Sequence, residues 1–264
     1  MKDTLLVPWR YRGPAKSGNG GWVSGALADA LGDTFGRAVT VTLRQPPPLD
    51  VTMRIAPRGS ADPDQDPVVG ADLTFGGALV AFAEVDPAEA VEGTLDPVEA
   101  VAWEQAAAAG AAYPGHVSHP FPTCFACGTE RDDGLRIFPG EVPPAHDGRT
   151  RVAASWVPDE TVRAESVERD DPAPRASLAA TWAALDCIGG WAGDLGERLM
   201  VLGRMTAVVD DLPVVGEPHV VTGEHRGSAG RRTSTASTLH DSDGRIVARA
   251  EHVWVAVDPA RFNG

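Results

Sequence analysis

The sequence predicts an α+β fold made of two similar halves, in each of which an antiparallel sheet wraps around one central helix. Each half contains one helix-like run followed by four or five strand-like runs. Both helix-like runs are rich in glycine and alanine, the small residues that a helix needs where strands approach it closely. The last strand-like runs of the halves, residues 79–84 and 246–251, also resemble each other, and Asp-Pro-Ala follows both. We therefore expect an internal duplication.

The first half, residues 1–90, begins its regular structure with a glycine-rich segment at 18–21. An apolar-periodic run over 22–31, closed by Gly32, predicts a short buried helix. Alternating apolar residues then predict strands over 38–43, 51–55, 68–75 and 78–85. The Gly76-Gly77 pair between the last two strands predicts a hairpin turn.

Residues 91–120 are expected to form a linker, with a helix over 97–112, and residues 121–264 the second half. A strong helix pattern covers 177–193, after a polar, acidic loop at 158–174. Asp243-Gly244 predicts a hairpin turn between the last two strands. Strands are expected over 134–138, 150–156, 200–209, 219–225, 233–239 and 246–257.

Composition excludes several classes of function. With 264 residues and 43% hydrophobic residues, the chain is large enough to bury a core. A formal net charge of −14 makes nucleic acid an unsuitable partner. The first residues lack the apolar run of a signal peptide, and no stretch approaches the ~18 apolar residues of a membrane span. Three cysteines are too few for a disulfide scaffold, so we expect a cytoplasmic protein.

Three short motifs carry a resemblance to a known family. Cys-Phe-Ala-Cys-Gly at 124–128, with Asp-Gly-Leu at 133–135, resembles a segment of phenylacetate-type hot-dog thioesterases. Asn-Gly-Gly at 19–21 resembles the His-Gly-Gly that precedes the first helix in that family. Ala-Leu-Asp-Cys-Ile-Gly-Gly-Trp at 184–191 resembles the helix of tandem hot-dog proteins in the same acyl-CoA thioesterase superfamily.

The resemblance implies two hot-dog units paired in one continuous sheet, with both helices on one face and ligand sites between the units. It implies an acyl-CoA or a related thioester as substrate. The implied reaction is hydrolysis by a carboxylate on the central helix, near backbone N–H groups at a helix N-terminus. We also expect a homodimer of tandem units.

Two carboxylates are candidates for catalysis. Asp186 lies inside an otherwise apolar helix, where a carboxylate is costly unless it has a partner. It could act as a nucleophile or as a base toward water, or it could instead face solvent or an arginine. Asp29 is the rival in the first half. The family places its acid nine residues after the histidine, and counting from Asn19 that position is Ala28, so Asp29 is turned ~100° away.

Substrate-binding candidates lie at the start of the first helix and late in the second. They are Asn19, Gly20, Gly21 and Trp22, and Gly189, Gly190 and Trp191. The amides after Asn19 suit a thioester carbonyl or a CoA phosphate, although asparagine followed by glycines is also an ordinary helix cap with close packing. The arginines at 226, 231 and 232 could meet CoA phosphates or form a solvated surface.

Cys124 and Cys127 form a Cys-x-x-Cys pair, which allows three interpretations. Structural zinc needs four ligands, and only His116, His119 and Cys187 are plausible additions. A redox pair favours a helix N-terminus after a strand, whereas this pair precedes a predicted strand. We therefore expect a packed structural turn, with no metal and no cofactor.

The predicted function is hydrolysis of a thioester-linked acyl group. Neither predicted helix contains a histidine, which argues against the hydratases of the same fold, and no serine nucleophile elbow is present. The alternatives are a non-catalytic double hot-dog protein that binds an acyl group or acyl-CoA, and a structural subunit that pairs with other hot-dog chains.

Overall fold

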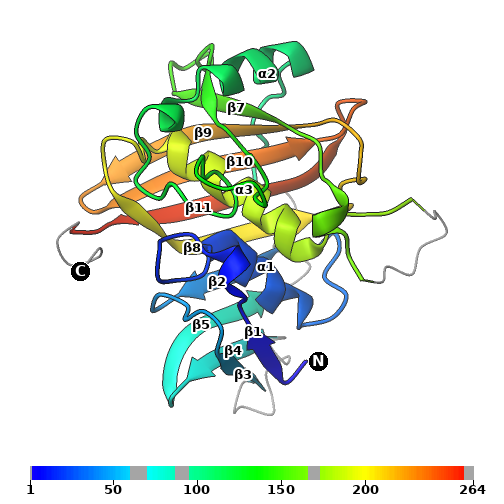
Figure 1. Ribbon diagram of the computed structural model, residues 1–264, viewed down its shortest axis with the longest axis vertical. Helices are drawn as coiled ribbons and strands as arrows, with labels where there is room; N and C mark the ends of the chain where they lie inside the picture. The colour runs from blue at the N-terminus through cyan, green and yellow to red at the C-terminus, as the bar shows by residue number, and fades with distance from the viewer. Residues whose placement is uncertain (1, 60–69, 87–94, 166–172, 259–264) are drawn as a thin grey trace.

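The computed structural model describes residues 2–59, 70–86, 95–165 and 173–258. The described strands form one antiparallel sheet in the order β1-β3-β4-β5-β2-β8-β11-β10-β9-β7-β6 (Figure 1). The strands are Thr4–Leu6 (β1), Val39–Leu43 (β2), Thr52–Pro57 (β3), Gly70–Phe75 (β4), Ala78–Val85 (β5), Gly140–Val142 (β6), Arg151–Trp156 (β7), Met200–Val209 (β8), His219–Ala229 (β9), Arg232–His240 (β10) and Ile246–Ala256 (β11).

The two halves of the sheet meet where β2 pairs with β8. The register places Thr40 opposite Thr206, and their hydroxyl oxygens are 2.8 Å apart in a hydrogen bond. Strands β1 to β5 lie on one side of this junction and β6 to β11 on the other. The first and second halves of the sequence therefore contribute one half-sheet each, as the sequence predicts.

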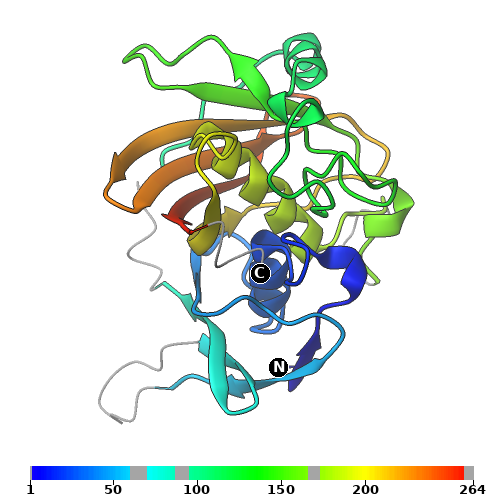
Figure 2. The same cartoon turned by 60° about the vertical axis from the view of Figure 1, so that its left-hand side comes forward.

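The α-helices are Gly20–Asp29 (α1), Trp103–Ala111 (α2) and Leu178–Ala192 (α3). Figures 1 and 2 show α1 and α3 side by side on one face of the sheet. Every residue of α3 is buried, because β7 to β11 cover one side of it and α1 the other. Glycines allow this contact: a Cβ on Gly25 would lie 2.8 Å from Ala179 Cα. The two predicted central helices are thus confirmed.

Asn19 explains why α1 begins two residues earlier than the apolar pattern indicates. Its side-chain Oδ1 accepts a hydrogen bond from Trp22 N over 2.8 Å, which caps the helix.

The hairpin predicted at Gly76 and Gly77 is confirmed. The two glycines adopt positive φ angles of 58° and 82° and join β4 to β5. The beginning of the strand predicted over 68–75 lies outside the described residues, and β4 starts at Gly70.

The strand predicted over 134–138 is wrong. This segment bonds to a loop instead: Leu135 N donates to Phe125 O over 2.8 Å, and Ile137 N donates to Ala126 O over 2.9 Å. Between them Arg136 has a positive φ of 59°, which is not the conformation of a strand. Because these amides are used by the Cys-x-x-Cys loop, they are not available to a neighbouring strand, and β6 begins only at Gly140.

The segment predicted as a linker contains α2, which packs on the second half. Ala106 of α2 is buried together with Ala153 of β7 and Val220 of β9. Figure 1 shows α2 lying beside β7, near the edge of the sheet. The boundaries at residues 90 and 120 remain a prediction. Among the residues that the structure describes, no helix has the length and apolar character needed to span a bilayer.

Candidate functional site

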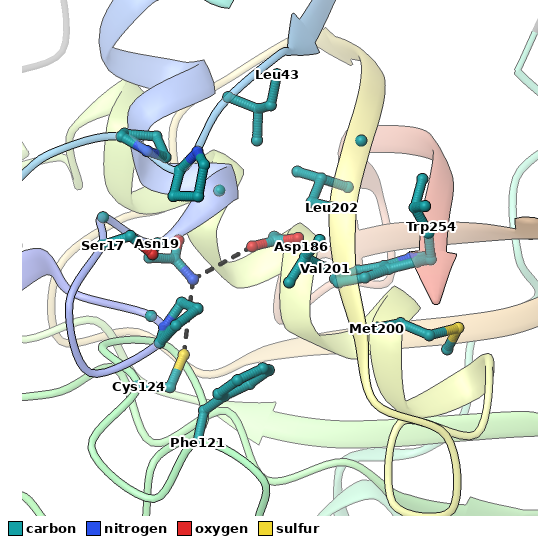
Figure 3. A pocket seen from close by; sticks show the side chains of 18 of the residues that line it. Ser17, Asn19, Leu43, Phe121, Cys124, Asp186, Met200, Val201, Leu202 and Trp254 are labelled. Carbon is teal, nitrogen blue, oxygen red and sulfur yellow. Dashed lines mark hydrogen bonds between the residues drawn. The ribbon is translucent and has the colours of Figure 1, made fainter. Parts of the chain in front are cut away.

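A cavity of about 410 Å³ lies where the two halves meet (Figure 3). This volume is in the range of small-molecule sites. Its lining comes from the segment before α1, the loop after β2, the Cys-x-x-Cys loop, α3, and the strands β8 and β11. Most of the side chains that face it are apolar, among them Leu43, Phe121, Leu195, Met200, Leu202 and Trp254; the polar or ionisable ones include Ser17, Asn19, Cys124 and Asp186.

Asp186 reaches this cavity from the middle of α3. The residue is 2% exposed, and its Oδ2 accepts hydrogen bonds from Gly21 N over 2.9 Å and from Asn19 Nδ2 over 3.2 Å. Its Oδ1 is buried and has no hydrogen-bond partner within the described part of the chain. The carboxylate of one half is therefore held at the helix N-terminus of the other half, with one oxygen left for a ligand.

Burial raises the pKa of Asp186 to about 7. The hydrogen bond from Gly21 N opposes this shift because it stabilises the charged form, and Asn19 does the same more weakly; the Cys124 side chain adds to the rise in pKa. A carboxyl group with a pKa near neutrality can both accept and release a proton in a reaction at physiological pH.

Gly21 is required by the closeness of the two helices. A Cβ at this position would lie 2.4 Å from Asp186 Cβ and 2.7 Å from Trp182 O, distances that no ordinary contact allows. Gly20 lines the cavity, and its backbone N–H makes no hydrogen bond to any residue the structure describes. The Asn-Gly-Gly sequence thus forms the predicted cap with close packing, and the N–H of Gly21 is bonded to Asp186. Its contact with a thioester or a phosphate stays a prediction.

Asp29, the rival acid, lies at the end of α1, away from the cavity lining. Its side chain is 48% exposed, and its Oδ2 is 2.7 Å from Lys2 Nζ in an ion pair. The preceding residue, Ala28, is fully buried. The structure therefore places Asp29 where the one-residue offset predicts, turned away from the interior.

Four of the predicted substrate-binding residues do not line the cavity. Trp22 stacks on Tyr11 with ring centroids 4.1 Å apart, and Trp191 packs edge-on against Tyr113 at 4.7 Å. The other two are Gly189 and Gly190, which make room for the side chains of His252 and Trp254. Their positions give no support to a role in substrate binding.

The arginine cluster also lies outside the lining. Arg226 pairs with Glu224 at 3.2 Å and donates to the carbonyl of Asp96, and Arg231 donates to the carbonyl of Ala256.

The sequence analysis does not identify two segments that form much of the cavity wall, the loop at 43–47 and the start of β8. The run of three prolines at 46–48 could have indicated the loop, because proline ends the sheet pairing of β2.

The three cysteines gather at one end of the cavity, and all three line it. Their sulfur atoms lie within 4.8 Å of one another, with Cys124 and Cys187 3.6 Å apart. Hydrogen bonds from the Cys127 and Cys187 thiols lower the pKa of Cys124 well below its usual value. The pKa values of Cys127 and Cys187 are raised, that of Cys127 chiefly by burial and that of Cys187 chiefly by its contact with Cys124.

No model of a protein family matches the sequence, and no curated protein sequence matches it. Solved structures do match over nearly the whole chain. A protein of unknown function with a hot dog fold from Alicyclobacillus acidocaldarius is 12% identical, with a TM-score of 0.61 over 97% of this chain and 93% of that one. An acyl-CoA thioesterase II from Mycobacterium marinum is 12% identical, with a TM-score of 0.58 over 98% and 94%. A tesB protein from Mycobacterium avium subs paratuberculosis is 12% identical, with a TM-score of 0.58 over 97% and 92%. The chain therefore has the double hot-dog fold, which confirms the predicted fold class.

Proposed function

We propose that the chain hydrolyses the thioester of an acyl group, such as an acyl-CoA, in the cavity between the two hot-dog units. The observation that carries this proposal is the environment of Asp186. A buried carboxylate, one oxygen of which has no partner among the residues described, lines an apolar cavity and is held by the first turn of the opposite helix. Such a group has no evident structural purpose, because burying it is costly, yet it suits acid–base or nucleophilic chemistry.

The acyl chain would lie among the apolar side chains of β8, β11 and the loop after β2. Its carbonyl oxygen would accept a hydrogen bond from Gly20 N–H, where the positive end of the α1 dipole stabilises a developing oxyanion. Asn19 and Gly21 hold Oδ2 of Asp186 so that Oδ1 points to the substrate. The same contacts keep the carboxylate in one rotamer throughout the reaction.

Two mechanisms are compatible with this geometry. In the first, Asp186 Oδ1 removes a proton from water as the water oxygen attacks the carbonyl carbon, and the proton then passes to the departing thiolate. In the second, Oδ1 attacks the carbonyl carbon itself, forms a mixed anhydride and expels the thiolate, and water hydrolyses the anhydride. Label in the Asp186 carboxylate after a single turnover in H₂¹⁸O would establish the second mechanism, because only hydrolysis of the anhydride at its Asp186 carbonyl carbon can leave ¹⁸O there.

The solved structures with this fold include proteins described as thioesterases, which supports the reaction class but not a particular acyl group. The assignment to the phenylacetate type rests on the short motifs at 124–128 and 133–135. We therefore include aryl-acyl and straight-chain acyl-CoAs together in the substrate panel.

The test is the Asp186→Asn variant, assayed on that panel. We expect kcat/KM to fall by about 10²–10⁴-fold, the usual contribution of a positioned acid–base group, while the melting temperature does not fall. Asp29→Asn is the matched control, because it removes a carboxylate of the other helix outside the cavity.

Unchanged turnover in Asp186→Asn would remove this residue from the reaction. If the unmodified protein shows no turnover but acyl-CoAs raise its melting temperature, the chain is the non-catalytic binding protein of the alternative interpretation. A lack of both effects would contradict any acyl-CoA site in this cavity.

A further inference from the structure

Three thiols from two distant parts of the sequence meet beside Asp186. Cys124 and Cys127 lie on the loop before β6, and Cys187 lies on α3. They are the only cysteines in the sequence, and all three are buried. A shared cluster of every cysteine in the chain is a more specific arrangement than the packed turn that the sequence alone suggests.

The spacing of the sulfur atoms fits one metal ion. A zinc–sulfur bond is about 2.3 Å long, so two thiolates on a tetrahedral zinc lie ~3.8 Å apart. Cys124 Sγ and Cys187 Sγ are 3.6 Å apart, and all three sulfur atoms lie within 4.8 Å of one another.

The Cys-x-x-Cys-Gly turn is closed tightly and places both of its sulfur atoms in the cluster. Gly128 N donates to the carbonyl of Cys124 over 2.9 Å, and a Cβ at Gly128 would lie 2.5 Å from Cys124 N. The backbone of the turn is therefore fixed by its own hydrogen bond and by close packing.

One side-chain donor approaches the cluster. Asn19 Nδ2 lies 3.6 Å from Cys124 Sγ and 3.8 Å from Cys187 Sγ. All three sulfur atoms are buried and line the cavity beside Asp186. Cysteine sulfur is a ligand that zinc prefers in proteins.

We propose that Cys124, Cys127 and Cys187 bind one zinc ion, whose fourth coordination position faces the cavity. Thiolates select zinc over magnesium or calcium, and three protein ligands with an exchangeable fourth one are sufficient to hold it. The histidines considered with the cysteines are not ligands: His116 Nε2 and His119 Nε2 lie 3.2 and 3.0 Å from the carbonyl oxygens of Gly110 and Cys127. This proposal is independent of the proposed reaction.

The experiment uses the full-length chain, reduced and dialysed against buffer with trace zinc. We expect one zinc per chain by plasma mass spectrometry, released when a mercurial reagent modifies the thiols. Replacement by Co²⁺ should give thiolate-to-cobalt charge-transfer absorption and the intense visible bands of a tetrahedral site. Cys187→Ser and Cys124→Ser should each weaken zinc binding more than the 10–100-fold typical of a lost outer-shell contact.

Asp186→Asn is the matched control, because it alters the neighbouring carboxylate and leaves all three sulfurs in place; its zinc content should equal that of the unmodified chain. The proposal is wrong if the unmodified, reduced protein takes up no zinc and gives no cobalt–thiolate absorption. It is equally wrong if both serine variants retain full zinc. The measurements on the unmodified chain decide the matter even if a serine variant does not fold, and none of them depends on turnover.

Discussion

The two central helices begin in different ways, and the difference bears on where the proposed reaction would occur. Asn19 caps α1 and is followed by two glycines, so that the opposite helix can bring a carboxylate to the first turn. Ser177 caps α3 by accepting from Ala180 N, but Leu178 and Ala179 follow it. The two helix starts therefore differ in the access that they give to their backbone N–H groups.

The same asymmetry appears at the position of the acid. Asp186 is nine residues beyond the cap of α3, and the residue nine beyond the cap of α1 is Ala28, which is fully buried. The first turn of α1 thus donates a backbone N–H to the carboxylate of Asp186, whereas the matching position that would serve α3 is Ala28. A fold with two similar units need not contain two equivalent sites, and here the features of a site are concentrated at the start of α1.

The largest effect should come from giving the first helix the acid that it lacks. Ala28→Asp would bury a carboxylate without the two N–H donors that hold Asp186, so we expect a loss of about 4 kcal/mol in the free energy of unfolding. Ala28→Asn, of similar size but without charge, should lose markedly less. Urea unfolding at pH 7.5 measures both, and equal losses would show that volume and not charge distinguishes the two helices.

The next largest loss of stability should come from adding a methyl group where α1 and α3 touch. Gly21→Ala places a Cβ against Asp186 and the backbone of Trp182, and overpacking of this kind costs about 3 kcal/mol. Gly25→Ala crowds Ala179 similarly but does not touch Asp186. Both variants should unfold at lower urea concentration than Gly59→Ala, whose new Cβ meets no atom of the described residues within 4 Å. If Gly21→Ala has the stability and turnover of Gly59→Ala, the proposed closeness of α1 to the carboxylate is wrong.

The helices and the acid could be predicted from the sequence because their signals are local. A lone carboxylate in an apolar helix is conspicuous, and Asp186 is indeed the acid that lines the cavity. The strand expected over 134–138 failed because its amides bond to a loop that only the tertiary structure brings close. The placement of Gly190 against Trp254 was equally unpredictable, since their contact joins α3 to β11 across the core.

The cavity wall could not be predicted for the same reason. Leu43 and Leu202 belong to strands that are 159 positions apart in the sequence, yet both line one cavity because β2 pairs with β8. Strand pairing between the halves depends on register, which apolar alternation alone does not fix. Likewise, the proximity of Cys187 to Cys124 follows from the way α3 packs on the loop before β6.

The halves should also differ in their response to acid, because the first 90 residues contain no histidine. Burial lowers the pKa of His252, which lies under α3, to about 4, below its value near 6.5 in the unfolded chain. The unfolded state therefore binds more protons between these values, and stability is lost as the pH falls through this window. From pH 6.5 to 5 the loss from His252 alone should be about 2 kcal/mol.

Urea unfolding of the unmodified chain and of His252→Gln at several pH values tests this expectation. The variant should show a shallower fall in stability, though not a flat one, because burial also lowers the pKa values of His119, His219 and His240. Parallel curves for the two proteins would mean that folding does not lower the pKa of His252.

The smallest effect should come from replacing Asp29, the acid of the first helix, whose side chain does not line the cavity. Asp29→Ala removes an exposed ion pair with Lys2, so it should change the free energy of unfolding by less than about 1 kcal/mol. Lys2→Ala should have a similar effect, and the double variant should show little coupling beyond the sum. Turnover of Asp29→Ala should match that of the unmodified protein, because its carboxylate lies at the opposite end of α1 from Asn19. A large loss of turnover would require a second reactive centre at the end of α1, and the contrast between the two helix starts would then no longer explain where the chemistry occurs.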